Sequence, residues 1–225
     1  MSALGASTST TVIVGGVYRE RCLRPAWREV YGSAGRAASA MTGMGAPVVL
    51  HSYLDALTEE VLAARAAFEG FGLASTAITE SVTFDYDHGL ATPRIFCQKA
   101  PVPALQISAN QILRFGLLEG DAIVHGQRVV YDPQDALTPK AFHLNGSTAG
   151  ELALILNRHE AALMSAMVNA SPQAMAEALL QGGQANVVVI KQGPLGALVH
   201  DGRAAELVPA YRSQTVWKIG SGDKF

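Results

Sequence analysis

Short runs of β-branched and aliphatic residues alternate with helical segments along this chain, and that alternation constrains the fold more than any other feature. The runs include Thr11–Val14, Pro47–His51, Leu152–Leu156 and Val187–Ile190. They are largely apolar and show no alternation of apolar and polar residues, so we expect strands that are buried on both faces. The predicted fold class is therefore α/β, a mostly parallel sheet flanked by helices on both faces.

Helical signals occupy the intervals between these runs. Residues 34–44 are small and rich in alanine and methionine, which suits a tightly packed helix. Asp55 is predicted to cap a helix over 56–69, and Ser171 to cap a helix that begins at Pro172. The apolar positions expected to face the core in the helix over 56–69 are Leu57, Val61, Leu62 and Phe68.

The middle of the chain departs from the alternation of strands and helices. Residues 71–97 alternate β-prone residues with turn signals, which indicates a small β flap instead of another strand–helix unit. Two further strands are expected after it, at Asp121–His125 and Val129–Pro133. The predicted organisation is a flexible tail at residues 1–10 and one α/β domain over 11–225.

Composition excludes several classes of protein. The 225 residues include 17 Lys and Arg against 19 Asp and Glu, and this balance argues against a nucleic-acid binder that relies on neutralising phosphates. Apolar residues make up 49% and charged residues 16%, which argues against a disordered chain. Two cysteines are too few for a disulfide scaffold.

The sequence also favours a soluble cytoplasmic protein. No run of about 18 apolar residues is present, so we expect no membrane-spanning helix. The first residues carry no positive charge and no long apolar stretch, so we expect no signal peptide.

The last residues carry a motif that could bind a phosphate. Gly220, Ser221, Gly222 and Asp223 form a Gly-x-Gly-Asp turn, which exposes successive backbone N–H groups beside a carboxylate. Such a turn could hold a phosphate and take a proton from a hydroxyl. An ordinary C-terminal tail is the alternative, and the motif alone leaves both open.

Asn157 and Glu160 directly follow the predicted strand Leu152–Leu156. Ligands of open α/β sheets bind at the carboxyl ends of strands, and amide and carboxylate oxygens suit a metal such as magnesium. A helix cap followed by an acid in the first turn is a very common use of the same two residues. Taken alone, the motif favours the helix cap.

Lys191 and the glycines Gly193 and Gly196 follow the strand Val187–Ile190. The glycines would let the backbone approach a nucleotide, but they suit a plain hairpin turn equally well.

Three other patterns argue against alternative sites. Gly15 and Gly16 follow the first strand without a third glycine at the required spacing, so a nicotinamide site is not expected. The six histidines show no zinc-binding spacing. The arginines between Arg19 and Arg28 are expected to form a solvated basic face, although they could grip an anionic substrate.

Taken in order, these motifs resemble the ribokinase-like (PfkB-type) carbohydrate and nucleoside kinase family. Gly220–Phe225 is similar to the family's G-A-G-D-x-F signature, and Asn157–Glu160 to its N-x-x-E motif. Val189–Val199 resembles its strand–G-x-x-G segment, and Tyr131–Pro133 the strand that precedes N-x-x-E. Gly32–Gly45 looks like its glycine-opened substrate helix. The resemblance covers nearly the whole chain.

The resemblance implies a β lid and the transfer of the γ-phosphoryl group of ATP to a hydroxyl of a sugar- or nucleoside-like substrate, with Mg²⁺. It implies that Asp223 is the base and that Gly220, Ser221 and Gly222 form the anion hole. Asn157 and Glu160 would serve the magnesium–phosphate arrangement. The residues expected along the nucleotide are Asn157, Lys191, Gly193, Gly196 and Lys218.

Several positions depart from the family pattern. Trp217–Lys218 stand where the family has D-T, Tyr31–Gly32 where it has a glycine pair, and Arg36 where it has an asparagine. Glu20 is the acid nearest to the expected substrate-binding aspartate. These changes argue against an ordinary sugar and favour an anionic or nucleoside-like substrate that contacts Glu20, Tyr31, Gly32 and Arg36.

Two functions of different classes remain open: a small-molecule kinase, and a non-catalytic ribokinase-like nucleotide- or metabolite-binding or regulatory subunit. The retained motifs favour the kinase, and the altered substrate pocket favours the subunit. Because few residues follow Gly220, the fold is expected to lack its C-terminal part, so that the natural chain continues past Phe225 or a second chain completes the ATP site. A homodimer formed through the β lid is a further expectation.

Overall fold

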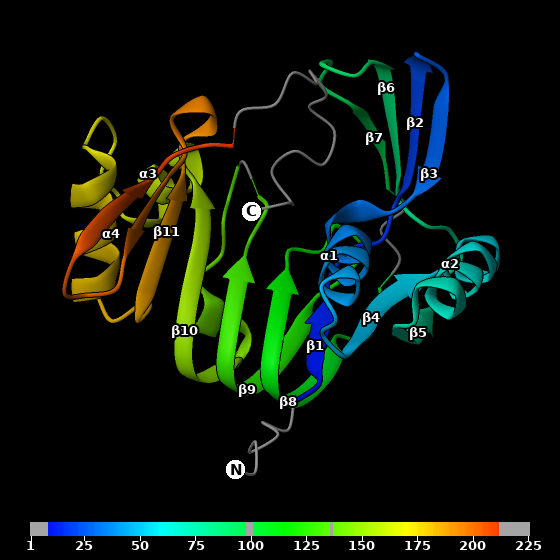
Figure 1. Ribbon diagram of the computed structural model, residues 1–225, viewed down its shortest axis with the longest axis horizontal. Helices are drawn as coiled ribbons and strands as arrows, with labels where there is room; N and C mark the ends of the chain where they lie inside the picture. Colours follow the sequence, from blue (N-terminus) through cyan, green and yellow to red (C-terminus); the bar gives the residue numbers. More distant parts are fainter. Residues whose placement is uncertain (1–8, 98–100, 136, 212–225) are drawn as a thin grey trace, which may run out of the picture.

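The computed structural model describes residues 9–97, 101–135 and 137–211. They form two sheets, a large one and a small one above its edge (Figure 1). The large sheet has the order β13-β12-β11-β10-β9-β8-β1-β4-β5. Its strands are β1 (Thr11–Val14), β4 (Val48–Leu54), β5 (Gly72–Ala77), β8 (Leu105–Phe115), β9 (Ala122–Asp132), β10 (Thr148–Asn157), β11 (Val187–Lys191), β12 (Ala197–His200) and β13 (Ala205–Val208).

The predicted α/β class is confirmed. In the large sheet the neighbours β11, β10, β9, β8, β1, β4 and β5 all pair in parallel. Strands β12 and β13 extend this sheet as antiparallel strands. One face of the sheet packs against α1 (Gly32–Gly43) and α2 (Ala56–Glu69). The other face packs against α3 (Arg158–Met164) and α4 (Pro172–Gln181). None of the described helices is long and apolar enough to cross a membrane.

The predicted helix starts are also confirmed, because their side chains satisfy free backbone N–H groups. Asp55 accepts a hydrogen bond from the backbone N–H of Thr58 at 2.8 Å. Ser171 accepts from the N–H of Ala174 at 3.1 Å, with Pro172 at the first position of α4. Two short 3₁₀ helices, Phe142–Asn145 and Gly193–Leu195, complete the helical elements that the structure describes.

Strands β8 and β9 are sharply bent. They pair in register from Leu105 beside Ala122 to Phe115 beside Asp132. Each has 11 residues, so a straight strand would be about 35 Å long. The link 116–121 returns the chain from Phe115 to Ala122, beside Leu105, and its seven Cα–Cα steps span at most about 25 Å. This is shorter than a straight strand, so β8 must bend.

Contacts at the upper end of the sheet confirm the bend. Arg114, near the end of β8, donates to Asp121, which precedes β9, at 3.0 Å. The Tyr53 hydroxyl, at the end of β4, lies 2.7 Å from the carbonyl oxygen of Pro103, just before β8. The first halves of β8 and β9 thus fold back behind their second halves. The two strands predicted at 121–125 and 129–133 are the two halves of β9.

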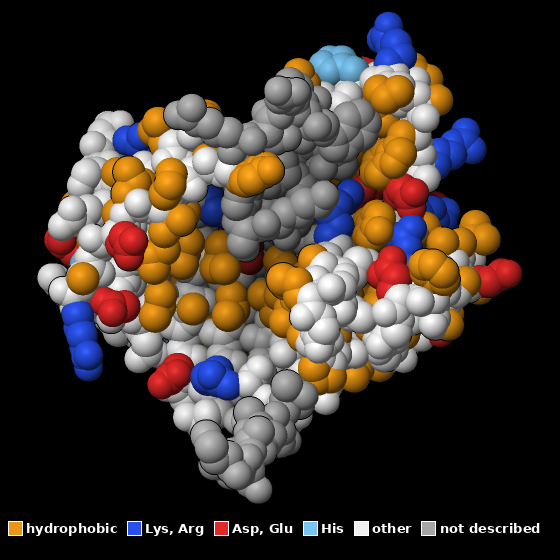
Figure 2. Space-filling view, in the orientation of Figure 1, with side chains coloured by type: hydrophobic (Ala, Val, Ile, Leu, Met, Phe, Trp, Pro, Cys, Tyr) orange, Lys and Arg blue, Asp and Glu red, His pale blue; other side chains and the backbone are white. Residues whose placement is uncertain are grey.

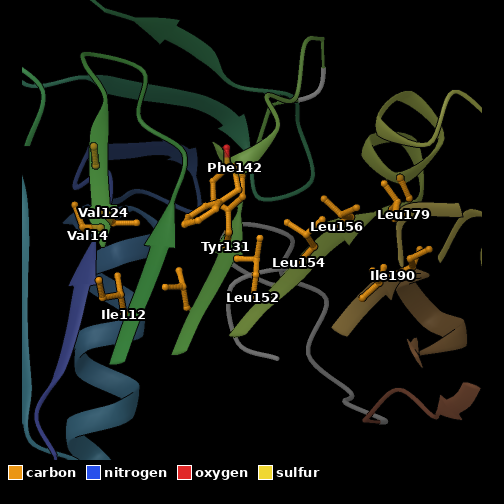
Figure 3. Packing of buried hydrophobic residues seen from close by; sticks show 14 of the residues in the cluster. Val14, Ile112, Val124, Tyr131, Phe142, Leu152, Leu154, Leu156, Leu179 and Ile190 are labelled. Carbon is orange, nitrogen blue, oxygen red and sulfur yellow. The ribbon is translucent and has the colours of Figure 1, made fainter. Parts of the chain in front are cut away.

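The returning halves of these strands supply part of the core. Val124 from the first half of β9 and Tyr131 from its second half belong to one buried cluster (Figure 3). The cluster continues through Leu154 of β10 to Leu179 of α4. No helix lies between β8 and β9 in the described residues. The first halves of these two strands take the place of a helix in covering their second halves.

The small sheet, here called the lid, has the order β3-β2-β6-β7. Its strands are β2 (Arg19–Arg24), β3 (Trp27–Val30), β6 (Thr83–His88) and β7 (Arg94–Phe96). The interval 71–97, expected to form a β flap, divides between the sheets: β5 extends the large sheet, and β6 and β7 enter the lid. The arginine-rich segment Arg19–Arg28, expected to be a solvated basic face, supplies β2 and the first half of β3. Two of its arginines, Arg19 and Arg21, pair with Asp55 and Asp85.

One predicted face is wrong. Of the four apolar positions expected to face the core in α2, Leu62 is buried, whereas Leu57, Val61 and Phe68 are exposed. The polar side chain of Arg65 turns toward the protein instead. It donates to the carbonyl oxygen of Val30 at 2.8 Å.

Candidate functional site

A cavity of about 1550 Å³ lies between the lid and the carboxyl ends of the parallel strands. In Figure 1 the arrowheads of β8, β9 and β10 point toward this region. Parallel α/β sheets place their ligand sites at this edge because successive loops converge there. The cavity lies where sequence reasoning placed Asn157, Glu160, Lys191, Gly193 and Gly196, and all five line it.

An ion pair connects two strand ends in the cavity wall. The Lys191 ammonium, at the end of β11, lies 2.7 Å from a carboxylate oxygen of Asp132, at the end of β9. Asp132 is buried and the Lys191 side chain is largely buried, so water screens the pair weakly. The pair places a cation and a carboxylate side by side at the cavity surface.

Asn157 and Glu160 form a reciprocal cap at the start of α3. The Asn157 side chain accepts from the backbone N–H of Glu160 at 2.9 Å, and the Glu160 carboxylate accepts from the N–H of Asn157 at 2.8 Å. The helix-cap interpretation of this motif is therefore confirmed. The capping role does not remove the residues from the cavity, since both line it.

The Glu160 carboxyl is the titratable group most affected by this environment. Burial, together with the neighbouring charge of Asp132, raises its pKa to about 7, against the lowering effects of the hydrogen bond from the Asn157 N–H and of the Lys191 charge. The two carboxylates are thus close enough to interact, and a cation that bound between them would favour the ionised form of Glu160.

Under the lid, Glu20 and Arg36 form a bidentate ion pair. Both Glu20 oxygens accept from the Arg36 guanidinium, one of them at 2.8 Å. The backbone N–H of Gly32 also lies 3.3 Å from Glu20, and the Tyr31 ring centre lies 5.3 Å from the guanidinium carbon of Arg36. The four residues predicted to contact the substrate therefore form one group, in which Glu20 and Arg36 line the cavity.

Gly32 is required by the start of α1. Its φ is +62°, and a Cβ there would lie 2.3 Å from the carbonyl oxygen of Gly16. A side chain is excluded by this contact and by the left-handed backbone. Gly32 thereby lets α1 begin against the end of β1, directly below the Glu20 carboxylate.

The lid and Tyr18, the residue just before it, present aromatic rings to the cavity. Tyr18 stacks on Phe84 with ring centres 5.0 Å apart, and Phe84 lies 6.4 Å from Tyr86 at an interplanar angle of 20°. All three line the cavity together with Ile95. We call Tyr18, Phe84 and Tyr86 the aromatic wall. It gives the lid side of the cavity a flat, largely apolar surface.

The two glycines after β11 have structural roles. Gly196 has a φ of +96°, and a Cβ would lie 2.0 Å from the carbonyl oxygen of Val208 in β13. Gly193 begins the short 3₁₀ turn. This turn leads into β12, which pairs antiparallel with β11, so the predicted hairpin turn is confirmed, and both glycines also line the cavity.

Sequence reasoning missed three features of the cavity. Asp132 could have been found by the rule that ligand groups follow parallel strands, because it ends the run that begins at Val129. The alternation of Phe84 and Tyr86 was a signal for one aromatic face of a strand. Arg114 had no sequence signal. The predicted residues Lys218, Gly220, Ser221, Gly222 and Asp223 lie outside the described residues.

The fold defined by this sheet, lid and cavity is shared with known small-molecule kinases. A fructokinase from Vibrio cholerae O395, solved with fructose, ADP and calcium, matches with a TM-score of 0.71 at 13% identity, over 97% of this chain and 82% of the other. Phosphofructokinase-2 from Escherichia coli matches with a TM-score of 0.65 at 17% identity, over 96% and 83%.

A Burkholderia thailandensis nucleoside kinase, solved with inosine, matches with a TM-score of 0.65 at 17% identity, over 95% and 80%. The chain therefore has the ribokinase-like fold that its motifs predicted. No protein-family model and no curated protein matches the sequence.

Proposed function

We propose that this protein is an ATP-dependent kinase that transfers the γ-phosphoryl group to a hydroxyl of a nucleoside-like substrate. The observation that carries the proposal is the joint placement of Asp132, Asn157, Glu160 and Lys191 at the strand ends, opposite the Glu20–Arg36 pair and the lid. Phosphoryl transfer depends mainly on positioning and on charge stabilisation, and a covered cavity lined by both charge signs can provide both.

The residues present fit a magnesium ion. Mg²⁺ in phosphoryl-transfer sites is commonly held by one or two carboxylates together with substrate phosphates. Asp132 and Glu160 provide two interacting carboxylates in the cavity wall. When bound, the ion would neutralise charge on the phosphates of ATP. Lys191 would orient Asp132 through their ion pair and add positive charge beside the nucleotide.

The aromatic wall supports a nucleoside-like substrate over a simple sugar. A nucleobase stacked on an aromatic side chain gains about 1–3 kcal/mol, whereas a small sugar relies on polar groups that grip its hydroxyls. Glu20 already accepts from Arg36 and lies near Gly32. The favourable surface on the lid side is therefore the wall of Tyr18, Phe84 and Tyr86.

Asp223 is proposed as the base, in line with the resemblance of its motif. It would accept the proton of the substrate hydroxyl, while the backbone N–H groups of Gly220, Ser221 and Gly222 would stabilise the charge of the transferred group. Lys218 would contact the nucleotide. These roles rest on the sequence motif alone.

The test is an assay of ADP release over nucleosides, sugars and their phosphates, combined with calorimetric titration of ATP. We expect turnover with nucleosides to exceed that with sugars. Phe84→Leu should raise KM for nucleosides and leave ATP affinity unchanged, with Val168→Ala on an exposed loop as the control. Turnover confined to sugars would contradict the nucleoside assignment but leave the kinase assignment intact.

A matched test addresses the base. Asp223→Asn should abolish turnover while ATP affinity changes by no more than a few-fold, because the amide keeps the shape of the carboxylate and loses its proton affinity. A variant with the wild-type rate would refute the role of Asp223.

The second candidate is a non-catalytic nucleotide- or metabolite-binding subunit. It is favoured by the fact that Asn157 and Glu160 satisfy each other in a helix cap and that Asp132 is paired with Lys191. ATP binding without turnover on any substrate in the panel would establish this function and refute the kinase.

A further inference from the structure

Two of the connections between the large sheet and the lid meet beside the start of α2. Strand β2 begins at Arg19, shortly after β1, and β6 begins at Thr83, shortly after β5. Arg19 and Thr83 pair with each other, so these two connections enter the lid side by side. In Figure 1 the lid stands above α1 and α2. Figure 2 shows basic and acidic side chains close together where the lid meets these helices.

A single carboxylate binds both connections. Asp55 follows β4 as the cap of α2 and is buried. One of its oxygens accepts from the backbone N–H of Ser81, just before β6, at 2.8 Å, and also from the Arg19 guanidinium. The backbone N–H of Asp55 in turn donates to the Ser81 hydroxyl at 3.0 Å. The carboxylate therefore holds the entry points of two lid strands while its other oxygen caps the helix.

The surroundings of Asp55 keep it ionised. Burial alone would raise the pKa of this carboxyl, but the hydrogen bonds from Ser81 and Thr58 and the charge of Arg19 outweigh burial and hold the pKa below its ordinary value. The orientation of Arg19 is also fixed, because its Nε donates to the Thr58 hydroxyl at 3.2 Å. The ion pair therefore persists at neutral pH with a defined geometry.

The alternation of side chains in an extended segment connects this ion pair to the cavity. Neighbouring residues of a strand point to opposite faces. Arg19 points to Asp55, whereas Tyr18 and Glu20 on either side of it line the cavity. Fixing the Arg19 side chain therefore orients the Tyr18 ring of the aromatic wall and the Glu20 carboxylate toward the cavity.

The same helix holds a third connection, at the end of β3. Arg65 of α2 donates to the carbonyl oxygen of Val30 at 2.8 Å and to the Glu29 carboxylate at 2.6 Å. Its guanidinium carbon lies 3.8 Å from the centre of the Tyr31 ring. The chain is thus bound to α2 where it leaves the lid for α1, as well as where it enters β2 and β6.

We propose that Asp55 is a positioning residue for the substrate side of the cavity, because it fixes the lid on α2 through Arg19 and Ser81 and so sets the places of Tyr18 and Glu20. Its effect on the substrate rests on the proposed kinase function, whereas its hold on the lid does not. Without the ion pair, the lid should stay attached through its other contacts but move more freely.

The first test is hydrogen exchange of the full chain without substrate. Arg19→Met removes the ion pair and leaves the bonds of Asp55 to Ser81 and Thr58 in place, so this variant should fold. We expect the amides of β2 and β6 to exchange about tenfold faster, while those of β9 and β10 keep their wild-type rates. Arg19→Lys should restore most of the protection, because an ammonium group can still pair with Asp55.

The second test separates positioning from stability. In Arg19→Met, KM for the nucleoside with the fastest turnover should rise by about tenfold and kcat should change by less than about threefold, because the groups at the strand ends keep their places. Asp55→Asn should show the same split. It can keep the helix cap, but its amide N–H group would face the donors of Arg19 and Ser81. A residue that only stabilised the fold would lower the melting temperature without changing KM.

Two matched controls accompany these variants. Ser171→Ala removes the cap of α4 on the other face of the sheet, and Asp85→Asn breaks the more exposed pair with Arg21 inside the lid. Both should leave KM and the exchange of the lid at wild-type values. If Asp85→Asn loosened the lid as much as Arg19→Met, strand pairing within the lid would be the cause and the proposal would be wrong.

Unchanged lid exchange in Arg19→Met and Asp55→Asn would overturn the proposal. So would an equal rise of exchange in β9 and β10, which would indicate a general loss of stability, or a looser lid with an unchanged KM. A wild-type chain without turnover on any substrate would refute the kinase, and lid exchange alone would then decide whether Asp55 fixes the lid.

Discussion

The Arg114 guanidinium donates to a carboxylate oxygen of Asp121 at 3.0 Å, and this ion pair joins the end of β8 to the residue just before β9. The same guanidinium donates to the hydroxyl of Ser147 at 3.1 Å, just before β10. It also lies against the Tyr131 and Phe142 rings, at 4.7 and 5.6 Å from their centres. One buried arginine thus joins the end of β8 to the residues that precede β9 and β10.

Arg114→Leu should therefore destabilise the fold by about 2–4 kcal/mol, because it removes a buried partner and leaves polar groups unsatisfied. The loss is smaller for Asp121→Asn, whose side chain is half-exposed and still able to bond to Asn145. Urea unfolding measures both. Equal stability of Arg114→Leu and wild type would show that the network is not needed to hold the strands.

Gly126→Ala should destabilise the protein by about 1–3 kcal/mol. A Cβ at this position near the middle of β9 would lie 2.8 Å from a methyl group of Val129 and 3.0 Å from one of Ile112. Gly43→Ala is the matched control. It has nothing within 4 Å of its Cβ position at the end of α1 and should be neutral or slightly stabilising. Thermal melts that rank the two variants in the opposite order would contradict the close packing at the bend.

The buried carboxyl group of Glu119 should make the free energy of unfolding depend on pH. Burial raises its pKa to about 7 from an ordinary 4.5. Because the folded state holds this proton more tightly than the unfolded state, the contribution of Glu119 to stability falls as the pH rises from about 4.5 to about 7. Glu119→Gln should stabilise the protein by about 3 kcal/mol at pH 8 and have little effect at pH 4. An equal effect at both pH values would contradict the raised pKa.

Lys191→Met should raise the pKa of Glu160 above its value of about 7, because the positive charge that lowers it is removed. In the proposed site, ionised Glu160 binds magnesium, so magnesium-dependent ATP binding should then shift to higher pH. Titrations of ATP between pH 6 and 9 would show the shift, with Lys140→Met as a control at another lysine of the cavity. An unchanged pH midpoint would exclude Glu160 from the binding site.

The elements that could be predicted from the sequence are those with local signals. Asp55 and Ser171 predict the starts of their helices, because a helix cap requires only one side chain and a backbone N–H group three residues later. The strand ends carry Asn157 and Lys191 to one edge because parallel strands end together. These local rules were sufficient to locate one wall of the cavity.

The remaining features depend on contacts between distant residues. The inward turn of Arg65 depends on Tyr31 and Glu29, which precede it by more than 30 residues, so periodicity alone assigned the wrong face to α2. The polar segment 19–24 forms a strand because it pairs with β3 and with the distant β6, where Arg21 lies beside Asp85. Likewise, the two halves of β9 were read as two strands because a bend leaves no sequence signal beyond Gly126.

The folded-back strands have a consequence for how this chain can vary in length. Parallel neighbours normally need a crossover of a dozen or more residues, usually a helix, whereas β8 returns to β9 through residues 116–121 alone. Strand β8 with its return is a coil of 17 residues from Leu105 to its neighbour Ala122. Such a coil is a modular unit: gaining or losing a whole one would widen or narrow the floor of the cavity while leaving the pairing of the remaining strands unchanged.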